Sequence, residues 1–297
     1  MPLLLLTVSC TSFDDNAESI GTLNLKLDFD LDMVRTGVAN DAGIRRSGDG
    51  KTYELRHTVE AYRKSAAGVV DEVPARRFVF KGEDAFAKSA ELPVSLEDGL
   101  YEFLVWTDFV EEGTETDYFY DTRDLRNIKL AGSHKGNNDF MDAFFGRAEV
   151  EVSEGYGNVT KDCGIVMERA VSKCDYFALD LSDVVSGISG TDLSECTVTF
   201  FYTGRIPSGF NALAGTTCMT RSGVEFSSTV ALDKDMRMTK IGFDYMFTDA
   251  EEYSVSLLIG IFDSKGRLLT TTTHMNVPVM RNTHSSMNCD FITPTVL

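Results

Sequence analysis

Residues 23–31 alternate strictly between apolar and polar side chains. Successive side chains of an extended strand point to opposite faces, so this period of two predicts a β-strand with one buried face and one solvated face. Asn24, Lys26, Asp28 and Asp30 fall on the polar face. The apolar row consists of Leu23, Leu25, Leu27, Phe29 and Leu31. A strand with this pattern needs a sheet in which to bury its apolar row.

Strand patterns continue along the whole chain, whereas helical periods are short and weak. Between two apolar runs, Asp263-Ser264-Lys265-Gly266 predicts a hairpin turn in which Gly266 takes a positive φ. Further strands are expected at 53–62, 78–80, 100–106, 148–152, 177–181, 196–202, 241–247, 255–262 and 268–275. Short strands separated by frequent turns are typical of β-sandwiches, so we expect an all-β fold.

The length of 297 residues exceeds the commonest domain size, so we expect the chain to divide into two domains. The expected division is a signal and tether at 1–21, one β-sandwich domain at 22–168 and a second at 169–297. Residues 34–51 are rich in Gly, Asp, Asn and Arg, and we expect an exposed loop there.

The formal net charge of −18 disfavours nucleic acid and anionic membrane surfaces as partners. A phosphate backbone favours clustered Lys and Arg, which this composition does not provide. No apolar stretch of about eighteen residues follows the leader, so any membrane attachment is expected to run through the N-terminus.

The N-terminus resembles a bacterial lipoprotein signal. Four leucines, at 3–6, lead through small residues to Cys10, and Asp14 and Asp15 follow closely. The resemblance implies acylation of Cys10, including a palmitoyl chain, and attachment to the outer membrane at the cell surface. The alternative is an ordinary buried cysteine, and the true start codon stays open.

The remaining five of the six cysteines lie in the second half of the chain: Cys163, Cys174, Cys196, Cys218 and Cys289. An odd number cannot pair completely, so either up to two disulfides form or all five stay reduced. None of them has the C-x-x-C spacing of a zinc site. We expect no metal and no cofactor.

No catalytic motif is present. Asp28, Asp30 and Asp32 resemble the opening of a calcium loop, but Met33 and Ala39 stand where that loop needs Gly and Glu. The four histidines are far apart, and the chain contains no nucleophile elbow, Walker loop or dinucleotide fingerprint. We therefore expect a protein that is not an enzyme.

Acidic and aromatic residues gather between 106 and 121, and three of the aromatics are candidates for stacking on a ligand such as a sugar ring: Trp106, Tyr118 and Tyr120. The alternative is a solvated loop that its aromatic residues anchor to the core.

Several strings, taken together, resemble the fimbrillin family, the subunits and anchors of type V pili in Gram-negative anaerobes, including the anchor of the minor fimbria. The resemblance covers nearly all of the chain after the leader. The strings are LYEFLVWTDFV from Leu100, DYFYDTRDLRNI from Asp117, NNDFMDAFFG from Asn137, FFYTGRIPSGFNALAG from Phe200, IGFDYMF from Ile241 and VPVMRNTHSSMNCDFIT from Val277.

The resemblance implies two transthyretin-like β-sandwich domains in tandem and assembly with other fimbrial subunits by strand exchange. In polymerising members, an arginine-specific protease removes the first strand, and a neighbour's strand takes its place. Here the apolar row at 23–31 is the candidate exchanged strand, and Arg35, Arg45 and Arg46 are the candidate cleavage sites. An anchor subunit would instead keep this strand and its lipid.

The function expected from these observations is a non-enzymatic surface lipoprotein that acts as an anchor or structural subunit of a fimbria and takes part in adhesion. The alternative is a monomeric surface lipoprotein that binds a glycan or another host ligand through Trp106, Tyr118 and Tyr120.

Overall fold

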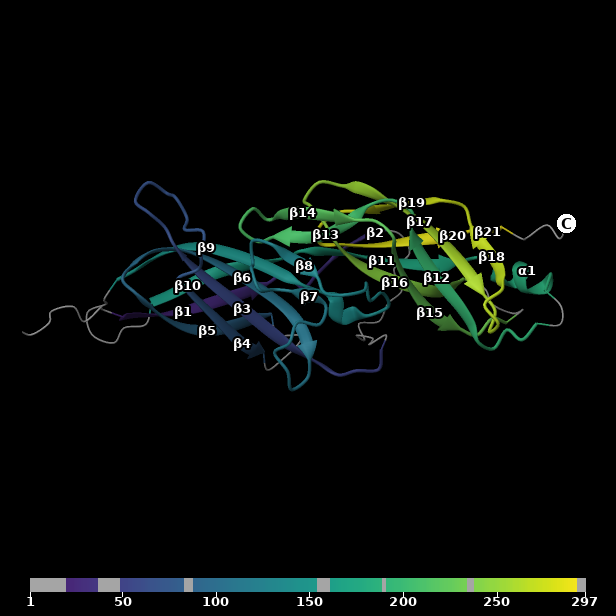
Figure 1. Ribbon diagram of the computed structural model, residues 1–297, viewed down its shortest axis with the longest axis horizontal. Helices are drawn as coiled ribbons and strands as arrows, with labels where there is room; N and C mark the ends of the chain where they lie inside the picture. Colours follow the sequence, from purple (N-terminus) through teal and green to yellow (C-terminus); the bar gives the residue numbers. More distant parts are fainter. Residues whose placement is uncertain are drawn as a thin grey trace, which may run out of the picture.

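The computed structural model describes residues 20–36, 49–82, 88–153, 161–188, 191–233 and 238–292, and within these ranges the chain consists mainly of β-strands and their connections (Figure 1). The predicted all-β fold is confirmed. Only two short helices occur in the described ranges, η1 (Asp139–Met141) and α1 (Leu181–Ser186). Neither is long and apolar enough to cross a membrane.

The first half forms a seven-stranded sheet that folds over on itself, in the order β4-β3-β6-β9-β10-β1-β5. β9 and β10 pair only where Phe144 and Phe145 meet Arg169 and Glu168. One core therefore lies between β3, β6 and β9 on one side and β10, β1 and β5 on the other. The strands are β1 (Ile20–Phe29), β3 (Tyr53–Arg63), β4 (Arg76–Gly82), β5 (Ser89–Glu97), β6 (Gly99–Glu111), β9 (Phe144–Val152) and β10 (Lys161–Arg169).

The second half encloses its own core between two sheets, in the orders β16-β11-β20-β2 and β15-β12-β17-β18-β21. β19 pairs with β17 outside this order. The strands are β2 (Val34–Thr36), β11 (Val171–Ala178), β12 (Cys196–Tyr202), β15 (Val224–Val230), β16 (Thr239–Phe247), β17 (Tyr253–Phe262), β18 (Leu268–Thr272), β19 (Met275–Val279), β20 (Thr283–Cys289) and β21 (Phe291–Ile292).

The halves are joined by a small sheet and by a shared core. The sheet, in the order β14-β13-β8-β7, pairs β8 (Ile128–Leu130) and β7 (Tyr120–Asp121) of the first half with β13 (Ile206–Asn211) and β14 (Thr216–Arg221) of the second. Beneath it, Trp106 of β6 packs against Phe210 of β13 and Phe247 of β16. Figure 1 shows the resulting elongated molecule, with β1 at the left, β18 at the right and β13 near the middle.

β6 separates two cores, which explains its sequence. Phe103 and Val105 lie in the core of the first half, whereas Leu104 and Trp106 lie in the core that the halves share. A strand covered on both faces has no solvated side, so its apolar run does not alternate.

Most predicted strands are confirmed within a few residues. The turn at 263–266 is confirmed as well, with Gly266 at φ 76°. The strand expected at 177–181 instead ends at Ala178, and α1 begins at Leu181. The strand expected at 268–275 is two strands, β18 and β19, which both pair with β17.

The predicted domain boundary at 168/169 stays a prediction. β10 belongs to the sheet of the first half and β11 to that of the second, and only Ala170 separates them. Backbone pairing nevertheless crosses between the halves at β8–β13 and at β2–β20.

Candidate functional site

β1 lies inside the sheet of the first half although it is the first described element of the chain. It pairs in parallel with β10, from Leu23 opposite Lys161 to Phe29 opposite Met167. On its other edge it pairs antiparallel with β5, from Ile20 opposite Glu97 to Asp28 opposite Ser89. Removal of β1 would therefore open a slot with unpaired backbone on both sides.

The apolar row fills this slot. Leu23, Leu25, Leu27 and Phe29 are 2%, 0%, 1% and 7% exposed, and Leu31 packs against the same core. Phe29 meets the ring of Phe144 edge-on, with the centroids 5.4 Å apart. The outer face is polar, and there Lys26 lies 2.7 Å from the carboxylate of Asp162 on β10.

Immediately after β1, the chain crosses to the second half and forms β2. Its backbone pairs in parallel with β20, and Val34, Arg35 and Thr36 lie opposite Thr283, His284 and Ser285. We call residues 20–36 the strap, because β1 belongs to a sheet of the first half and β2 to a sheet of the second.

The prediction of a loop from Val34 onward is wrong for its first three residues, which form the strand β2. Three residues are too few to show a period, and their partner strand lies far along the chain, so the sequence gives no local signal for β2. Arg35 lies within β2, whereas Arg45, Arg46 and Cys10 lie outside the described residues.

His57 of β3 lies next to the strap, where its ring is close to that of Phe29. It is 1% exposed, its Nδ1 lies 2.8 Å from Thr107 Oγ1, and its ring centroid is 5.9 Å from that of Phe29. Burial penalises the charged imidazolium and lowers the pKa of His57 to about 4. The imidazole is therefore neutral in the folded protein at neutral pH.

We expect His57 to make the folded protein less stable in mild acid. Its pKa is lowered from 6.5, so the unfolded chain binds a proton that the folded chain does not between pH 6.5 and about 4. This contribution is fully present above pH 6.5 and is lost as the pH falls, by roughly 3 kcal/mol in total. Urea unfolding of the wild type and of His57→Gln between pH 7.5 and 4.5 measures it. An equal pH dependence in both proteins would contradict the expectation.

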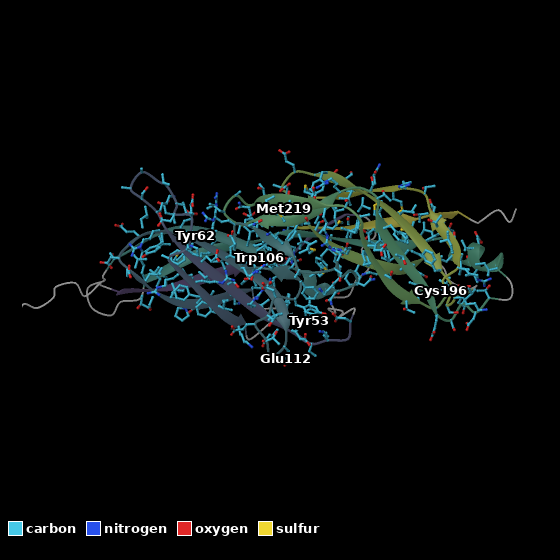
Figure 2. The ribbon with its side chains drawn as sticks, viewed as in Figure 1. Tyr53, Tyr62, Trp106, Glu112, Cys196 and Met219 are labelled. Atoms are coloured by element: carbon cyan, nitrogen blue, oxygen red, sulfur yellow. The ribbon has the colours of Figure 1, made fainter. Side chains whose placement is uncertain are left out.

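The structure places two of the three candidate ligand-binding aromatics in the core. Trp106 and Tyr120 are 0% and 1% exposed and pack edge to face, 5.5 Å apart, and the Tyr120 hydroxyl donates to the carbonyl of Met141. Figure 2 shows Trp106 within the body of the molecule, with Tyr53 and Glu112 toward its lower edge. Of the three, only Tyr118 is partly exposed, and its hydroxyl donates to Asp49 at 2.7 Å.

An open hollow of about 500 Å³ lies near Tyr118. Its lining includes Lys51, Tyr53, Glu54 and Phe140. Lys51 pairs with Glu111 at 2.8 Å, and Glu54 accepts from Lys81 at 2.5 Å. Lys51 and Glu54, two of the charged residues that line the hollow, thus have partners within the protein. No cluster of potential metal ligands occurs among the residues that the structure describes.

Arg56 of β3 ties the acidic region to the sheet. The Arg56 guanidinium bonds both oxygens of Asp108, at 2.9 and 2.7 Å, and lies 2.9 Å from Asp117. Arg56 is 3% exposed and Asp108 1%. Burial raises the pKa of Asp108, and the neighbouring Arg56 opposes that rise. The region between 106 and 121 is therefore anchored to the core by a buried ion pair as well as by its aromatic residues.

The five described cysteines are all free thiols. Of the two alternatives left open by the sequence, up to two disulfides or five reduced cysteines, the structure has the second. Cys174, Cys196 and Cys289 are buried, and burial raises the pKa of Cys174 to about 12. Cys218 is exposed on β14.

We expect iodoacetamide to modify Cys218 well before Cys174 and Cys289 in the native protein. The reaction needs an accessible thiolate, and burial denies both access and ionisation to the latter pair. Peptide mapping by mass spectrometry identifies the modified sites, and the same protein unfolded in guanidinium is the control. Equal rates at Cys174 and Cys218 in the native protein would contradict this result.

The fold and the slot define an all-β protein whose first strand completes the sheet of its first half. The chain belongs to a family of unknown function, DUF6562, whose model matches residues 16–296. No curated protein matches it.

Solved structures with a similar fold include three with related descriptions. A candidate adhesin from Bacteroides ovatus ATCC 8483 is 11% identical, covers 98% of this chain and 100% of its own, and has a TM-score of 0.47. The fimbrial anchor protein Mfa2 from Porphyromonas gingivalis is 12% identical, covers 84% of this chain and 82% of its own, and has a TM-score of 0.39. A fimbrial assembly protein from Parabacteroides distasonis ATCC 8503 is 10% identical, covers 91% of this chain and 90% of its own, and has a TM-score of 0.40.

These descriptions agree with the fimbrillin resemblance of the sequence. All three TM-scores lie below 0.5, so these likenesses carry no functional argument.

Proposed function

We propose that this protein is a non-enzymatic surface lipoprotein that serves as an anchor or structural subunit of a fimbria-like adhesive assembly. Its partners are other fimbrial subunits, which it engages by strand exchange at the slot of β1. The observation that carries the proposal is the position of β1, an N-terminal strand that pairs on both edges and buries a row of large apolar side chains.

Replacement of this strand would leave the pairing of β4, β3, β6, β9 and β10 in place. β10 keeps its pairing with β9 when β1 leaves, whereas β5 is the edge strand and pairs with β1 alone among the described strands. The apolar side chains of β5, Leu92, Val94 and Leu96, still hold it against the core of the first half. An incoming extended segment with the same alternation would restore both hydrogen-bonded ladders and refill the core. An empty slot would instead leave two edges and an apolar surface open to aggregation.

Two sequence features support the proposal. Cys10 would carry the lipid that holds the protein at the outer membrane, and Arg45 and Arg46 follow the strap where a cut would release it. Arg35 is a poorer site, because its backbone pairs with that of His284 in β20. Proteases bind extended, unpaired backbone, so the pairing of Arg35 leaves Arg45 and Arg46, in the loop expected from the sequence, as the preferred cleavage sites.

The first test is the mature N-terminus of the protein from native cells, by intact mass and terminal sequencing of surface material. An acylated Cys10 with residues 20–36 intact identifies an anchor that keeps its strap, whereas a start after Arg45 or Arg46 identifies a processed subunit. Copurification of either form with other fimbrial subunits is expected. If the isolated protein forms neither filaments nor complexes with such subunits, the fimbrial proposal fails.

The alternative, a monomeric protein that binds glycan through Trp106, Tyr118 and Tyr120, has less support in the geometry. Two of these rings are buried in the core that the halves share, where a sugar cannot stack on them. Saturable sugar binding that is lost in Tyr118→Ala would revive that alternative.

A further inference from the structure

The strap bends between β1 and β2, at the junction of the two halves, and a buried arginine meets it there. Arg169 is the last residue of β10 and is 3% exposed. Its guanidinium lies over the ring of Phe144, 4.6 Å from the centroid. A guanidinium at this depth has no water to solvate it, so its N–H groups need acceptors within the protein.

Five acceptor contacts surround the five N–H groups of Arg169. Nε and one Nη atom bond the two oxygens of Asp142, at 2.7 and 3.1 Å, and the other Nη bonds Asn282 Oδ1 at 2.6 Å. The remaining two acceptors belong to the strap. They are the backbone carbonyls of Asp30, at 3.4 Å, and Leu31, at 3.2 Å.

Asn282 adds a second contact to the same bend. While its Oδ1 accepts from Arg169, its Nδ2 donates to Asp30 Oδ2 at 3.1 Å. Asp30 Oδ1 in turn accepts from the backbone N–H of Asp32 at 3.1 Å, which closes the bend. Asn282 has a φ of 56°, a left-handed conformation that asparagine tolerates better than most residues.

The strap therefore supplies two of the five acceptors of a buried cation. If β1 leaves its slot, Arg169 keeps Asp142 and Asn282 but loses both carbonyls, and buried N–H groups without partners are costly. A replacement segment that reproduces only the part of the apolar row from Leu23 to Phe29 leaves that cost in place. A segment that continues for two residues beyond the position of Phe29, with both carbonyls turned to the junction, removes it.

We infer that Arg169, with Asn282, is a latch that selects the segment able to occupy the slot. This inference rests on the proposed strand exchange and names its partner more closely. The partner is an extended segment of another subunit with large apolar residues at alternating positions. Directly after the residue that takes the place of Phe29, it carries a residue with an acceptor side chain, such as Asp, and then one further residue with a free carbonyl.

The test uses the full-length protein with a site-specific protease sequence inserted after Arg46 and cut there. Two labelled peptides, amidated at the C-terminus, compete with the strap: one copies residues 20–29 and the other residues 20–31. Anisotropy gives the ratio of their affinities. Since each peptide competes with the same strap, the ratio reports only the added Asp30 and Leu31.

For the wild type we expect the longer peptide to bind at least about tenfold more tightly, because it restores two hydrogen bonds to a charged donor. Leu31 also adds apolar contact, which a latch variant retains. In Arg169→Met/Asp142→Leu, which removes the buried pair as a unit, the ratio should fall to about threefold or less. Asn282→Gly, which keeps the left-handed backbone, should lower the ratio in part.

A third peptide, residues 20–31 with Asp30→Ala, tests the side-chain acceptor on the unaltered protein. On the wild type it should bind more weakly than the parent peptide. On Asn282→Gly the two peptides should bind with equal affinity. An unchanged ratio in both latch variants overturns the latch while leaving strand exchange in place. If the cut wild-type protein takes up neither peptide, the proposed function is overturned and the latch with it.

Discussion

Leu25→Ala and Leu27→Ala are each expected to lower the free energy of unfolding by about 2–5 kcal/mol, the range for truncating a fully buried leucine. The two side chains are 0% and 1% exposed in the core between the layers of the first half. Each substitution removes apolar contact and leaves a cavity that a regular sheet cannot easily close. Urea unfolding at pH 7.5 measures the loss, provided the slope of the transition stays constant.

Val166→Ala is the matched control. Val166 lies on β10 opposite Asp28 of β1, but its side chain is 69% exposed. Its truncation should change the stability by less than about 0.5 kcal/mol. If Leu25→Ala and Leu27→Ala were as mild as this control, β1 would contribute little to the core, and its value as an exchangeable plug would be lost.

Arg56→Met is expected to cost about 3–5 kcal/mol, because it leaves the carboxyl of Asp108 buried without its cation. Asp108 is 1% exposed and bonds Arg56 through both oxygens. Arg56 also donates to the carbonyl of Glu115 at 2.9 Å and pairs with Asp117, so the substitution should loosen the acidic region too. Thermal and urea unfolding measure the stability, and limited proteolysis between 112 and 119 measures the loosening.

The double variant Arg56→Met/Asp108→Leu distinguishes the loss of the ion pair itself from the cost of leaving the Asp108 carboxyl buried without a partner. Replacing both partners with apolar residues is often neutral or stabilising, so the double variant should recover much of the loss. Arg123→Met is a surface control, since Arg123 pairs with Asp121 while its own side chain is 84% exposed. A double variant as unstable as Arg56→Met alone would show that the cost comes from lost packing.

The sequence predicted strands well where one face is solvated. In β1 the polar and apolar residues alternate, and in β17 an apolar run ends at a turn with a glycine, so both had local signals. β2 and β8 have only three residues each, too few for a period, and their partners β20 and β13 lie far along the chain. Strands of that kind exist because a sheet edge is available to them, and local sequence does not encode such an edge.

For the candidate site the apolar row was predictable, whereas the latch was not. Arg169 lies near the expected domain boundary and Asn282 follows Arg281 in a turn, positions that equally suit ordinary surface residues. Their role depends on the bend of the strap reaching both of them, across 139 and 252 positions of sequence separation. For Trp106 and Tyr120 the sequence left ligand stacking and anchoring to the core open, and their burial against residues of the second half agrees with anchoring.

Local sequence is enough to predict that the chain forms β-strands, which side of β1 is apolar, and where a glycine turn such as that at Gly266 falls. These properties follow from side-chain period and backbone preference within a few residues. Three features are seen only in the folded molecule: β1 lies between β10 and β5, β2 joins a sheet of the second half, and Arg169 meets the bend between β1 and β2. Strand order and buried ion pairs depend on contacts between distant segments, whose free energy appears only when the sheets close on a common core.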